Sequence, residues 1–254
     1  FGGQMLSMYH RVVDYPGLIA RNGRELRDHF VAHLQDLGLE YRLNCEVNEI
    51  DFDEMRIETS QERLTCRALI IATGARKRRL GIPGESEFEG RGVSLSATRD
   101  HALFAGRDVV VVGGGDSAIE NCLILARDCH HVTLIHRSDR FRARAEWIGQ
   151  VEEHPRITVI REAGLKAISG ESEVTHVVIE DYTTGVQRAI PASGVFVRIG
   201  MAPNTECFRG QIATDADGYI RCDEMMRTSL PMVYAVGDVC APICKSVATA
   251  VGHG

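Results

Sequence analysis

A run of four valines that leads into a glycine-rich turn and a helix constrains the fold of this chain more than any other feature. The valines at 109–112 predict a buried strand, and the glycines at 113–115 predict a sharp turn at its end. From residue 116 onward, apolar residues recur at helical spacing. Two glycines separated by one residue, with a small residue three positions later, fit G-x-G-x-x-G/A, which holds a dinucleotide pyrophosphate at a helix N-terminus. The residues that this pattern assigns to the dinucleotide are Gly113, Gly115, Asp116, Ser117 and Ala118.

The residues after the next predicted strand indicate which dinucleotide binds. That strand, at 132–135, ends about 20 residues after the glycine turn, where an NAD site places an acidic residue on the ribose 2′-hydroxyl. Here the candidate ligands are His136, Arg137 and Arg142, with Arg140 between them. A 2′-phosphate needs cations and fork-shaped donors, and a carboxylate would repel it. The sequence therefore favours NADPH over NADH; the alternative is a surface turn with a solvated basic cluster.

Length and composition limit the class of protein. A chain of 254 residues can form one large domain or two, and we expect two. With 44% hydrophobic and 25% charged residues it has the composition of a globular protein, and its net charge of −6 argues against nucleic-acid binding. Because the sequence has no long apolar run and no signal peptide, we expect a cytoplasmic protein without a membrane segment.

Strands alternate with helices and glycine-rich turns along the chain, which is typical of α/β architecture. A helix is predicted at 23–37. Strands are predicted at 40–43, 46–52, 56–58, 66–75, 157–161, 174–180, 186–190, 194–199 and 230–239. A turn is predicted at 169–170. The first residue is Phe1 rather than Met, and Gly254 lies at the start of a predicted helix, so we expect an interior piece of a longer protein.

The eight cysteines show neither a C-x-x-C pair nor the spacing of a zinc site, so no metal site is expected. In a cytoplasmic chain most are expected to be reduced packing residues. Cys122 and Cys129, on a predicted helix and at its end, are expected in or near the core.

Several motifs, in this order and spacing, resemble those of the low-molecular-weight thioredoxin reductases and their flavoprotein relatives. They are GGQ at 2–4, YPG at 15–17, LIIATGA at 69–75, GRGVS at 90–94, GGGDSA at 113–118, LIHR at 134–137, FVRIGMAPNT at 196–205 and YAVGDV at 234–239. The resemblance implies two Rossmann-like domains and a homodimer. An FAD domain would comprise residues 1–76 and 199–254, with an NADPH domain at 77–198 between them.

The resemblance also implies cofactor contacts. Those to FAD would be made by Gly3, Gln4, Asp14, Thr73, Gly74, Ala75, Gly237, Asp238, Lys245 and Ser246. Ile199 and Gly200 would contact NADPH. Two departures from the family pattern concern FAD. The glycine fingerprint for its ADP half is expected upstream of Phe1, and Lys245-Ser246 stands where the family usually has Arg-Gln. Lysine keeps the charge but not the planar fork of arginine.

A third departure concerns the redox centre. Thioredoxin reductases carry Cys-Ala-Thr-Cys-Asp just before the NADPH fingerprint, whereas this chain has Ser-Ala-Thr-Arg-Asp at 96–100. Neither Ser96 nor Arg99 has thiol chemistry, so we expect no disulfide reduction by the family route. Asp100 matches a candidate acid of the family; the alternative is a solvated or Arg99-paired carboxylate.

The electron acceptor is therefore open. The main hypothesis is an FAD-dependent oxidoreductase that takes hydride from NADPH and passes electrons to an unknown small redox protein or small molecule. One alternative is a ferredoxin- or flavodoxin–NADP reductase-like activity. Another is that Cys240 and Cys244, beside the flavin-contacting turn, replace the lost dithiol. A third is a non-catalytic NADPH-sensing module of a larger protein.

Overall fold

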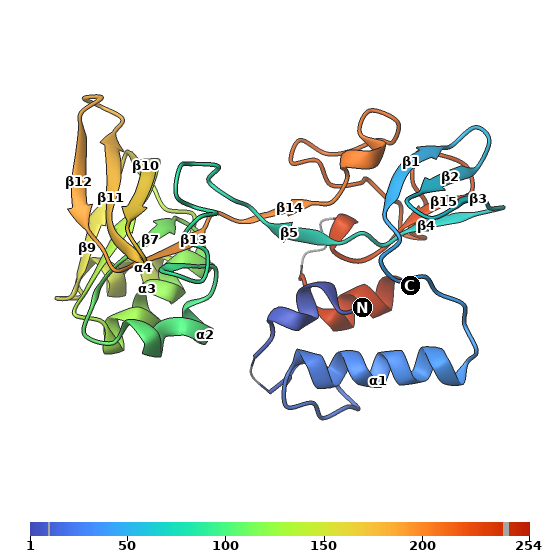
Figure 1. The fold of residues 1–254 in the computed structure, drawn as a ribbon, viewed down its shortest axis with the longest axis horizontal. Coiled ribbons are helices and arrows are strands. Elements are labelled where there is room, and N and C mark those ends of the chain that lie inside the picture. The colour runs from blue at the N-terminus through green and yellow to red at the C-terminus, as the bar shows by residue number, and fades with distance from the viewer. Residues whose placement is uncertain (10, 241–243) are drawn as a thin grey trace. The chain divides into compact units, whose positions relative to one another are not determined.

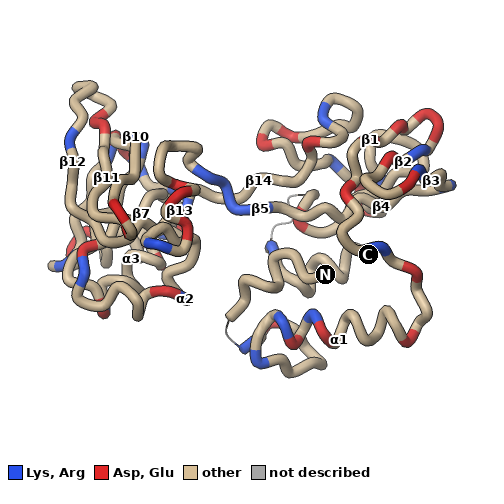
Figure 2. The backbone as a smooth tube through the Cα atoms, viewed as in Figure 1, with Lys and Arg blue, Asp and Glu red and all other residues tan. Residues whose placement is uncertain are grey.

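The computed structural model describes residues 1–9, 11–240 and 244–254, which form two compact units (Figure 1). The first unit comprises Phe1–Arg76 with Ala202–Gly254, and the second comprises Lys77–Met201. The chain passes between them through β5 (Ala75–Lys77) and β14 (Met201–Pro203), which pair with each other. The second crossing thus lies three residues after the position expected from the sequence. Figure 2 shows a run of Lys and Arg along β5.

A five-stranded parallel sheet forms the centre of the second unit. Its order is β6-β13-β7-β8-β9. The strands are β6 (Val93–Ser94), β7 (Asp108–Gly113), β8 (His131–Ile135), β9 (Ile157–Ile160) and β13 (Gly194–Arg198). The helices are α2 (Ala97–Asp100), η2 (His101–Phe104), α3 (Asp116–Asp128) and α4 (Ala145–Glu152).

The valine run is buried because both faces of β7 are covered. Val109 and Val111 share a core cluster with apolar residues of α3, including the fully buried Cys122. Val110 and Val112 belong to a second cluster on the opposite face of the sheet. A strand covered on both faces reads as a continuous apolar run, which explains why this segment was the strongest signal in the sequence.

An antiparallel sheet covers the face of the parallel sheet opposite α3. It consists of β10 (Ala163–Gly170), β11 (Val174–Asp181) and β12 (Gln187–Pro191). β10 was not predicted, and the predicted turn at 169–170 is wrong, because both residues pair with β11 at the end of β10. Small residues in β10 hid its strand character. Leu165 of β10 is buried and pairs with Ile179 of β11. Pairing with β11, rather than an alternating apolar pattern in its own sequence, therefore stabilises β10 as a strand.

The first unit contains the predicted helix, α1 (Gly23–Asp36), which Asn22 caps by accepting a hydrogen bond from the Glu25 amide. Strands β1 (Val47–Asp51), β2 (Arg56–Thr59) and β3 (Arg63–Thr65) form an antiparallel sheet. The strand predicted at 40–43 is wrong, since this segment has no regular structure.

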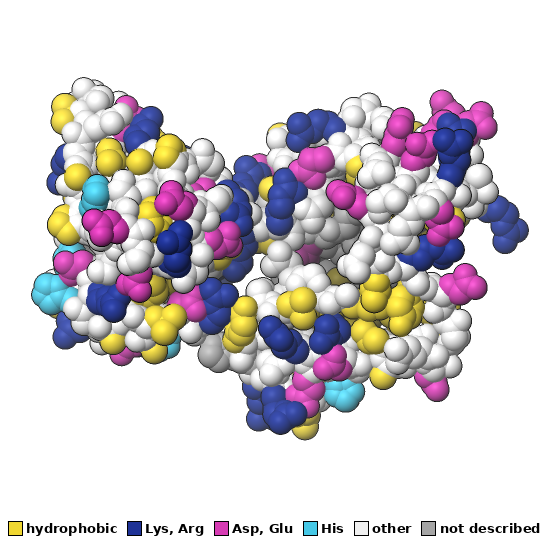
Figure 3. All heavy atoms as spheres, viewed as in Figure 1, with side chains coloured by type: hydrophobic (Ala, Val, Ile, Leu, Met, Phe, Trp, Pro, Cys, Tyr) yellow, Lys and Arg dark blue, Asp and Glu magenta, His cyan; other side chains and the backbone are white. Residues whose placement is uncertain are grey.

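A parallel pair, β4 (Leu69–Ile71) and β15 (Val233–Ala235), lies elsewhere in the first unit. The remaining elements are η1 (Gly3–Ser7), η3 (Glu206–Phe208), η4 (Gly237–Cys240) and α5 (Val247–His253). None of the helices in the described ranges is long and apolar enough to cross a membrane. Charged side chains of both signs are interspersed over the face seen in Figure 3.

The close approach of Gly114 to His136 gives a test of packing in the second unit. A Cβ at Gly114 would lie 2.1–2.7 Å from three His136 ring atoms, and the ring is buried. We expect Gly114→Ala to lower the free energy of unfolding by about 1–3 kcal/mol, measured by urea denaturation, because the ring must move. Gly115→Ala is the control, since its Cβ would meet nothing within 4 Å and its φ of −99° suits any residue. Equal losses in the two variants would contradict the steric explanation.

Candidate functional site

The glycine turn after β7 is shaped as a pyrophosphate site. Gly113 has φ +151°, and a Cβ there would lie 2.2 Å from the Arg198 carbonyl oxygen and 2.8 Å from the Ala118 Cβ. A larger residue at either position would therefore separate α3 from the sheet. Gly115 is the N-cap of α3, makes no side-chain cap, and leaves open space around its Cα. A phosphate can thus approach the free amides of the first helical turn, and these residues fit a dinucleotide.

Asp116 and Ser117, also assigned to the dinucleotide, differ in their surroundings. The Asp116 carboxylate accepts a hydrogen bond from the Arg144 amide at 2.9 Å and pairs with the Arg144 guanidinium at 3.3 Å. It therefore ties the start of α3 to the loop after β8 and is partly neutralised. Ser117 is exposed in the first turn of α3.

Arg137 and Arg142 lie on the exposed loop that follows β8. The Arg142 amide donates a hydrogen bond to the Gly114 carbonyl oxygen at 2.8 Å, which anchors this loop to the glycine turn. In the described part of this loop the ion pairs are Arg140–Asp139 and Arg144–Asp116, which leaves Arg137 and Arg142 without a carboxylate. Two guanidinium groups are thus available next to the pyrophosphate site.

His136 is placed differently from the two arginines. The residue is only 8% exposed, and its ring stacks on Phe141 with ring centroids 4.9 Å apart. Its Nε2 lies 2.9 Å from the Arg140 carbonyl oxygen, and the ring packs against Gly114. The imidazole therefore packs under the loop that carries Arg137 and Arg142 and supports it. The sequence alone could not distinguish this role from a direct contact with phosphate.

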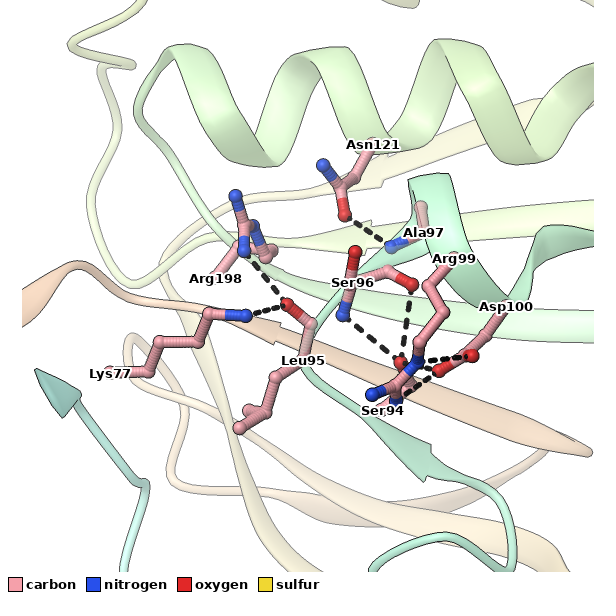
Figure 4. Close-up of polar contacts among 9 residues, drawn as sticks. All are labelled: Lys77, Ser94, Leu95, Ser96, Ala97, Arg99, Asp100, Asn121 and Arg198. Atoms are coloured by element: carbon pink, nitrogen blue, oxygen red, sulfur yellow. Dashed lines mark hydrogen bonds and ion pairs between the residues drawn. The ribbon is translucent and has the colours of Figure 1, made fainter. Parts of the chain in front are cut away.

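The segment at the family's dithiol position is held by internal polar contacts (Figure 4). The Ser94 hydroxyl donates to Asp100 at 2.6 Å, and the Ser96 amide donates to the Ser94 hydroxyl at 3.0 Å. The Ala97 amide donates to the Asn121 side-chain oxygen of α3 at 2.9 Å. These bonds attach α2 to the dinucleotide-binding helix and place residues 96–99 beside it.

Asp100 is paired with Arg99, one of the two alternatives that the sequence left open. The Arg99 Nε donates to the Asp100 carboxylate at 2.5 Å, and the Asp100 side chain is 12% exposed. Burial acts to raise the pKa of Asp100, but the hydrogen bonds from Arg99 and Ser94 outweigh it and hold the pKa below its ordinary value. A carboxyl that is ionised at neutral pH is a poor proton donor.

Two cations that sequence reasoning did not assign meet beside this segment. Lys77 Nζ and an Arg198 amino group donate to the Leu95 carbonyl oxygen at 2.9 and 2.8 Å (Figure 4). Burial and the neighbouring Arg198 and Arg99 lower the pKa of Lys77 to about 8. The only sequence signal was a charged residue, Arg198, in an otherwise apolar strand. Ile199 and Gly200, the expected NADPH contacts, follow it directly.

In the first unit, two of the predicted FAD loops lie at one sheet edge. β4 and β15 are parallel, with Ile71 opposite Ala235, so the turn at 72–75 and the turn at Gly237 leave the sheet side by side. Gly74 has φ +69° and open space around its Cα, which suits a close ligand approach. Asp238 is half-buried, and no hydrogen bond or ion pair joins its carboxylate to another described residue. This edge fits the flavin nucleotide.

The N-terminal motif reaches the same edge. Gln4 Nε2 donates to the Ala75 carbonyl oxygen at 3.0 Å, so a residue 71 positions away in sequence contacts the ATGA turn. Thr73, in the same turn, donates a hydrogen bond from its hydroxyl to the Asn204 carbonyl oxygen at 2.7 Å. Gly3, next to Gln4, is exposed.

The other predicted FAD residues have contacts of their own or lie in loops. The Lys245 ammonium lies 4.8 Å from the centroid of the Tyr219 ring, and Ser246 caps α5 by accepting from the Thr249 amide. Asp14 is exposed in the loop between Val12 and Ala20.

The cysteine next to the flavin-contacting turn has a sulfur neighbour that the sequence did not suggest. Cys240 Sγ lies 3.6 Å from Cys222 Sγ, and η4 ends at Cys240. Cys244 is exposed, and residues 241–243, which connect the two, lie outside the described residues. Within the described ranges, no group of three His, Cys, Asp or Glu side chains could hold a metal ion.

Known proteins resemble this chain over nearly its whole length. The family described as pyridine nucleotide-disulphide oxidoreductase matches residues 8–254. A thioredoxin reductase from Listeria innocua is 38% identical over 100% of this chain and 80% of its own length. The crystal structure of Lactococcus lactis thioredoxin reductase in the FR conformation has a TM-score of 0.77 at 34% identity, covering 99% of this chain and 84% of that chain. The T. acidophilum thioredoxin reductase structure has a TM-score of 0.73 at 32% identity, covering 99% and 83%.

These neighbours have two Rossmann-like domains, so the predicted α/β fold class is confirmed. The predicted resemblance is confirmed as well, by both the family match and the identity to the relatives. The thioredoxin reductases are FAD-dependent and use NADPH. The chain therefore belongs to the pyridine nucleotide-disulphide oxidoreductase family, and within it to the proteins that resemble thioredoxin reductase.

Proposed function

We propose that this protein is an FAD-dependent oxidoreductase that accepts hydride from NADPH and lacks the redox dithiol of thioredoxin reductases. One observation carries the proposal. Ser96 and Arg99 occupy the dithiol positions, and the segment is attached to the dinucleotide-binding helix through Asn121. The segment at residues 96–99 therefore lies beside the dinucleotide-binding helix, but Ser96 and Arg99 cannot form or exchange a disulfide.

On the NADPH side, each group has a distinct task. The turn at Gly113–Gly115 and the first amides of α3 hold the pyrophosphate. Arg137 and Arg142 neutralise and fork onto the 2′-phosphate, while His136 supports their loop from below. Ile199 and Gly200, which directly follow β13, would contact NADPH.

On the FAD side, the edge formed by β4 and β15 receives the flavin nucleotide. Asp238, whose carboxylate has no bond among the described residues, would hold FAD through its ribityl chain. Gln4 is held in place at this edge by its hydrogen bond to Ala75. FAD and NADPH supply the hydride chemistry itself when bound, and the protein binds and orients them.

The acceptor must receive electrons without a thiol at residues 96 and 99. A ferredoxin- or flavodoxin–NADP reductase activity is the second candidate, because it needs no dithiol beside the fingerprint. Lys77 and Arg198 favour it further, because both cations donate to the Leu95 carbonyl oxygen rather than to a carboxylate. Asp100 balances the charge of Arg99, so these two cations supply the local positive charge that suits an acidic carrier. On the family resemblance we also propose a cytoplasmic location and a homodimer. Light scattering of the purified protein tests the homodimer.

An anaerobic experiment tests the function. The protein with FAD is mixed with NADPH, and the visible flavin absorbance is followed; we expect it to bleach. Reoxidation is then followed with ferredoxin, flavodoxin or a disulfide, and we expect the disulfide to be the poorest acceptor. NADPH binding without bound flavin would instead indicate a sensing module. Rapid reoxidation by thioredoxin disulfide would contradict the loss of the dithiol.

A further inference from the structure

Cys222 and Cys240 come from segments that the fold holds side by side. The Ile220 amide donates to the Val239 carbonyl oxygen at 3.0 Å, which joins the chain before one cysteine to the chain before the other. Ile220 and Val239 are buried in the same core cluster of the first unit, and both cysteines pack against it. The proximity of the two sulfurs therefore follows from the main-chain pairing and the core.

The geometry of the pair suits a disulfide. The two sulfurs are 3.6 Å apart, so closing the bond requires an approach of about 1.5 Å, given a normal S–S length of about 2.05 Å. Rotations about the side-chain bonds cover part of this distance. Cys222 Sγ also lies 3.7 Å from the Ala235 carbonyl oxygen of β15. Both cysteines are half-buried, so a small reagent can reach their thiols.

We propose that Cys222 and Cys240 are a redox dithiol that exchanges with small disulfides. The Cys222 thiolate attacks a disulfide R–S–S–R, forms a mixed disulfide and releases one thiol after protonation. Cys240 then loses its proton and attacks the Cys222 sulfur, which forms the Cys222–Cys240 bond and releases the second thiol. Two protein thiols are oxidised and one small disulfide is reduced to two thiols, so atoms and electrons balance.

The environment sets the order of attack and the rate. Burial first, and then the neighbouring Cys222, raise the pKa of Cys240 to about 12. Burial also raises the pKa of Cys222, but the hydrogen bond with Cys240 acts in the opposite direction and stabilises the Cys222 thiolate, so Cys222 is the attacking group. The exchange is consequently slow at neutral pH, and its rate should rise about tenfold for each pH unit until Cys222 is ionised.

Peptide mapping tests the pairing. The full chain is treated with 2-hydroxyethyl disulfide, which is small and uncharged and so can reach a half-buried thiol, and remaining thiols are then alkylated. Trypsin cleaves after Arg221, Arg227 and Lys245, which separates Cys222 in peptide 222–227 from Cys240 in peptide 228–245. We expect these two peptides linked to each other, a loss of two of the eight thiols, and recovery of both on adding dithiothreitol.

Cys244 lies in the same peptide as Cys240, so variants complete the assignment. Cys244→Ser should retain the linked peptides, and Cys240→Ser should abolish them while circular dichroism shows a folded protein. Two results would overturn the proposal. One is a disulfide within peptide 228–245, which would pair Cys240 with Cys244. The other is the absence of linked peptides in Cys244→Ser at pH 9, where the thiolate fraction is raised.

Discussion

Replacing both Arg137 and Arg142 by alanine is expected to weaken NADPH binding about a hundred-fold and to leave NADH binding within about twofold. Both guanidinium groups are exposed on the loop after β8, without a carboxylate in the described part of that loop. Hydrogen bonds to a charged group contribute about 1.5–3 kcal/mol each, and about 1.4 kcal/mol corresponds to a factor of ten in affinity. Calorimetric titration with each dinucleotide measures both constants.

Two single substitutions provide controls for this prediction. Arg140→Ala removes the same charge from the same loop, but Arg140 already pairs with Asp139 at 3.6 Å. Arg127→Ala removes a charge near the opposite end of α3 and reports the effect of net charge alone. Both are expected to change NADPH affinity less than fivefold. If NADH binding fell as far as NADPH binding in the double variant, the two arginines would be supporting the pyrophosphate rather than recognising the 2′-phosphate.

Local patterns predicted the centre of the second unit well and its periphery poorly. β7, its turn and α3 could be predicted because burial on both faces of one strand leaves a continuous apolar run, and the turn needs small residues at Gly113 and Ala118. β10 could not, because its residues become a strand through pairing with β11. Segment 40–43 fails for the converse reason, since alternating residues without a neighbouring strand do not form a ladder.

The site shows the same division between local and long-range information. The type of residue at 136, 137 and 142 indicated a phosphate, but only packing separates the buried His136 from the two exposed arginines. Sequence spacing drew attention to Cys244 as the companion of Cys240. The sulfur beside Cys240 belongs to Cys222, 18 positions earlier, because a main-chain hydrogen bond joins two distant segments. Contacts of this kind have no local pattern.

Placing two cysteines at residues 96 and 99 is expected to create a disulfide centre at these positions. In Ser96→Cys/Arg99→Cys the thiols would stand three residues apart at the start of α2, on one side of the turn. Lys77 and Arg198 both bond to the carbonyl oxygen of the preceding Leu95, and nearby cations favour a thiolate. We expect NADPH-dependent reduction of an aromatic disulfide to rise at least tenfold over the parent protein.

The same change should convert Asp100 into a proton donor. Removing the Arg99 guanidinium takes away the strongest hydrogen bond that lowers the pKa of this carboxyl, while burial, which raises it, remains. The pKa of Asp100 should therefore rise in the double-cysteine variant, so a larger fraction can protonate a leaving thiolate. The matched control, Ser96→Ala/Arg99→Ala, changes Asp100 in the same way without adding thiols, and its activity should stay at the parent level. If the double-cysteine protein forms the disulfide but gains no activity, the prediction is contradicted. That result would show that the flavin does not pass electrons to residues 96 and 99 and that electrons leave it at another face.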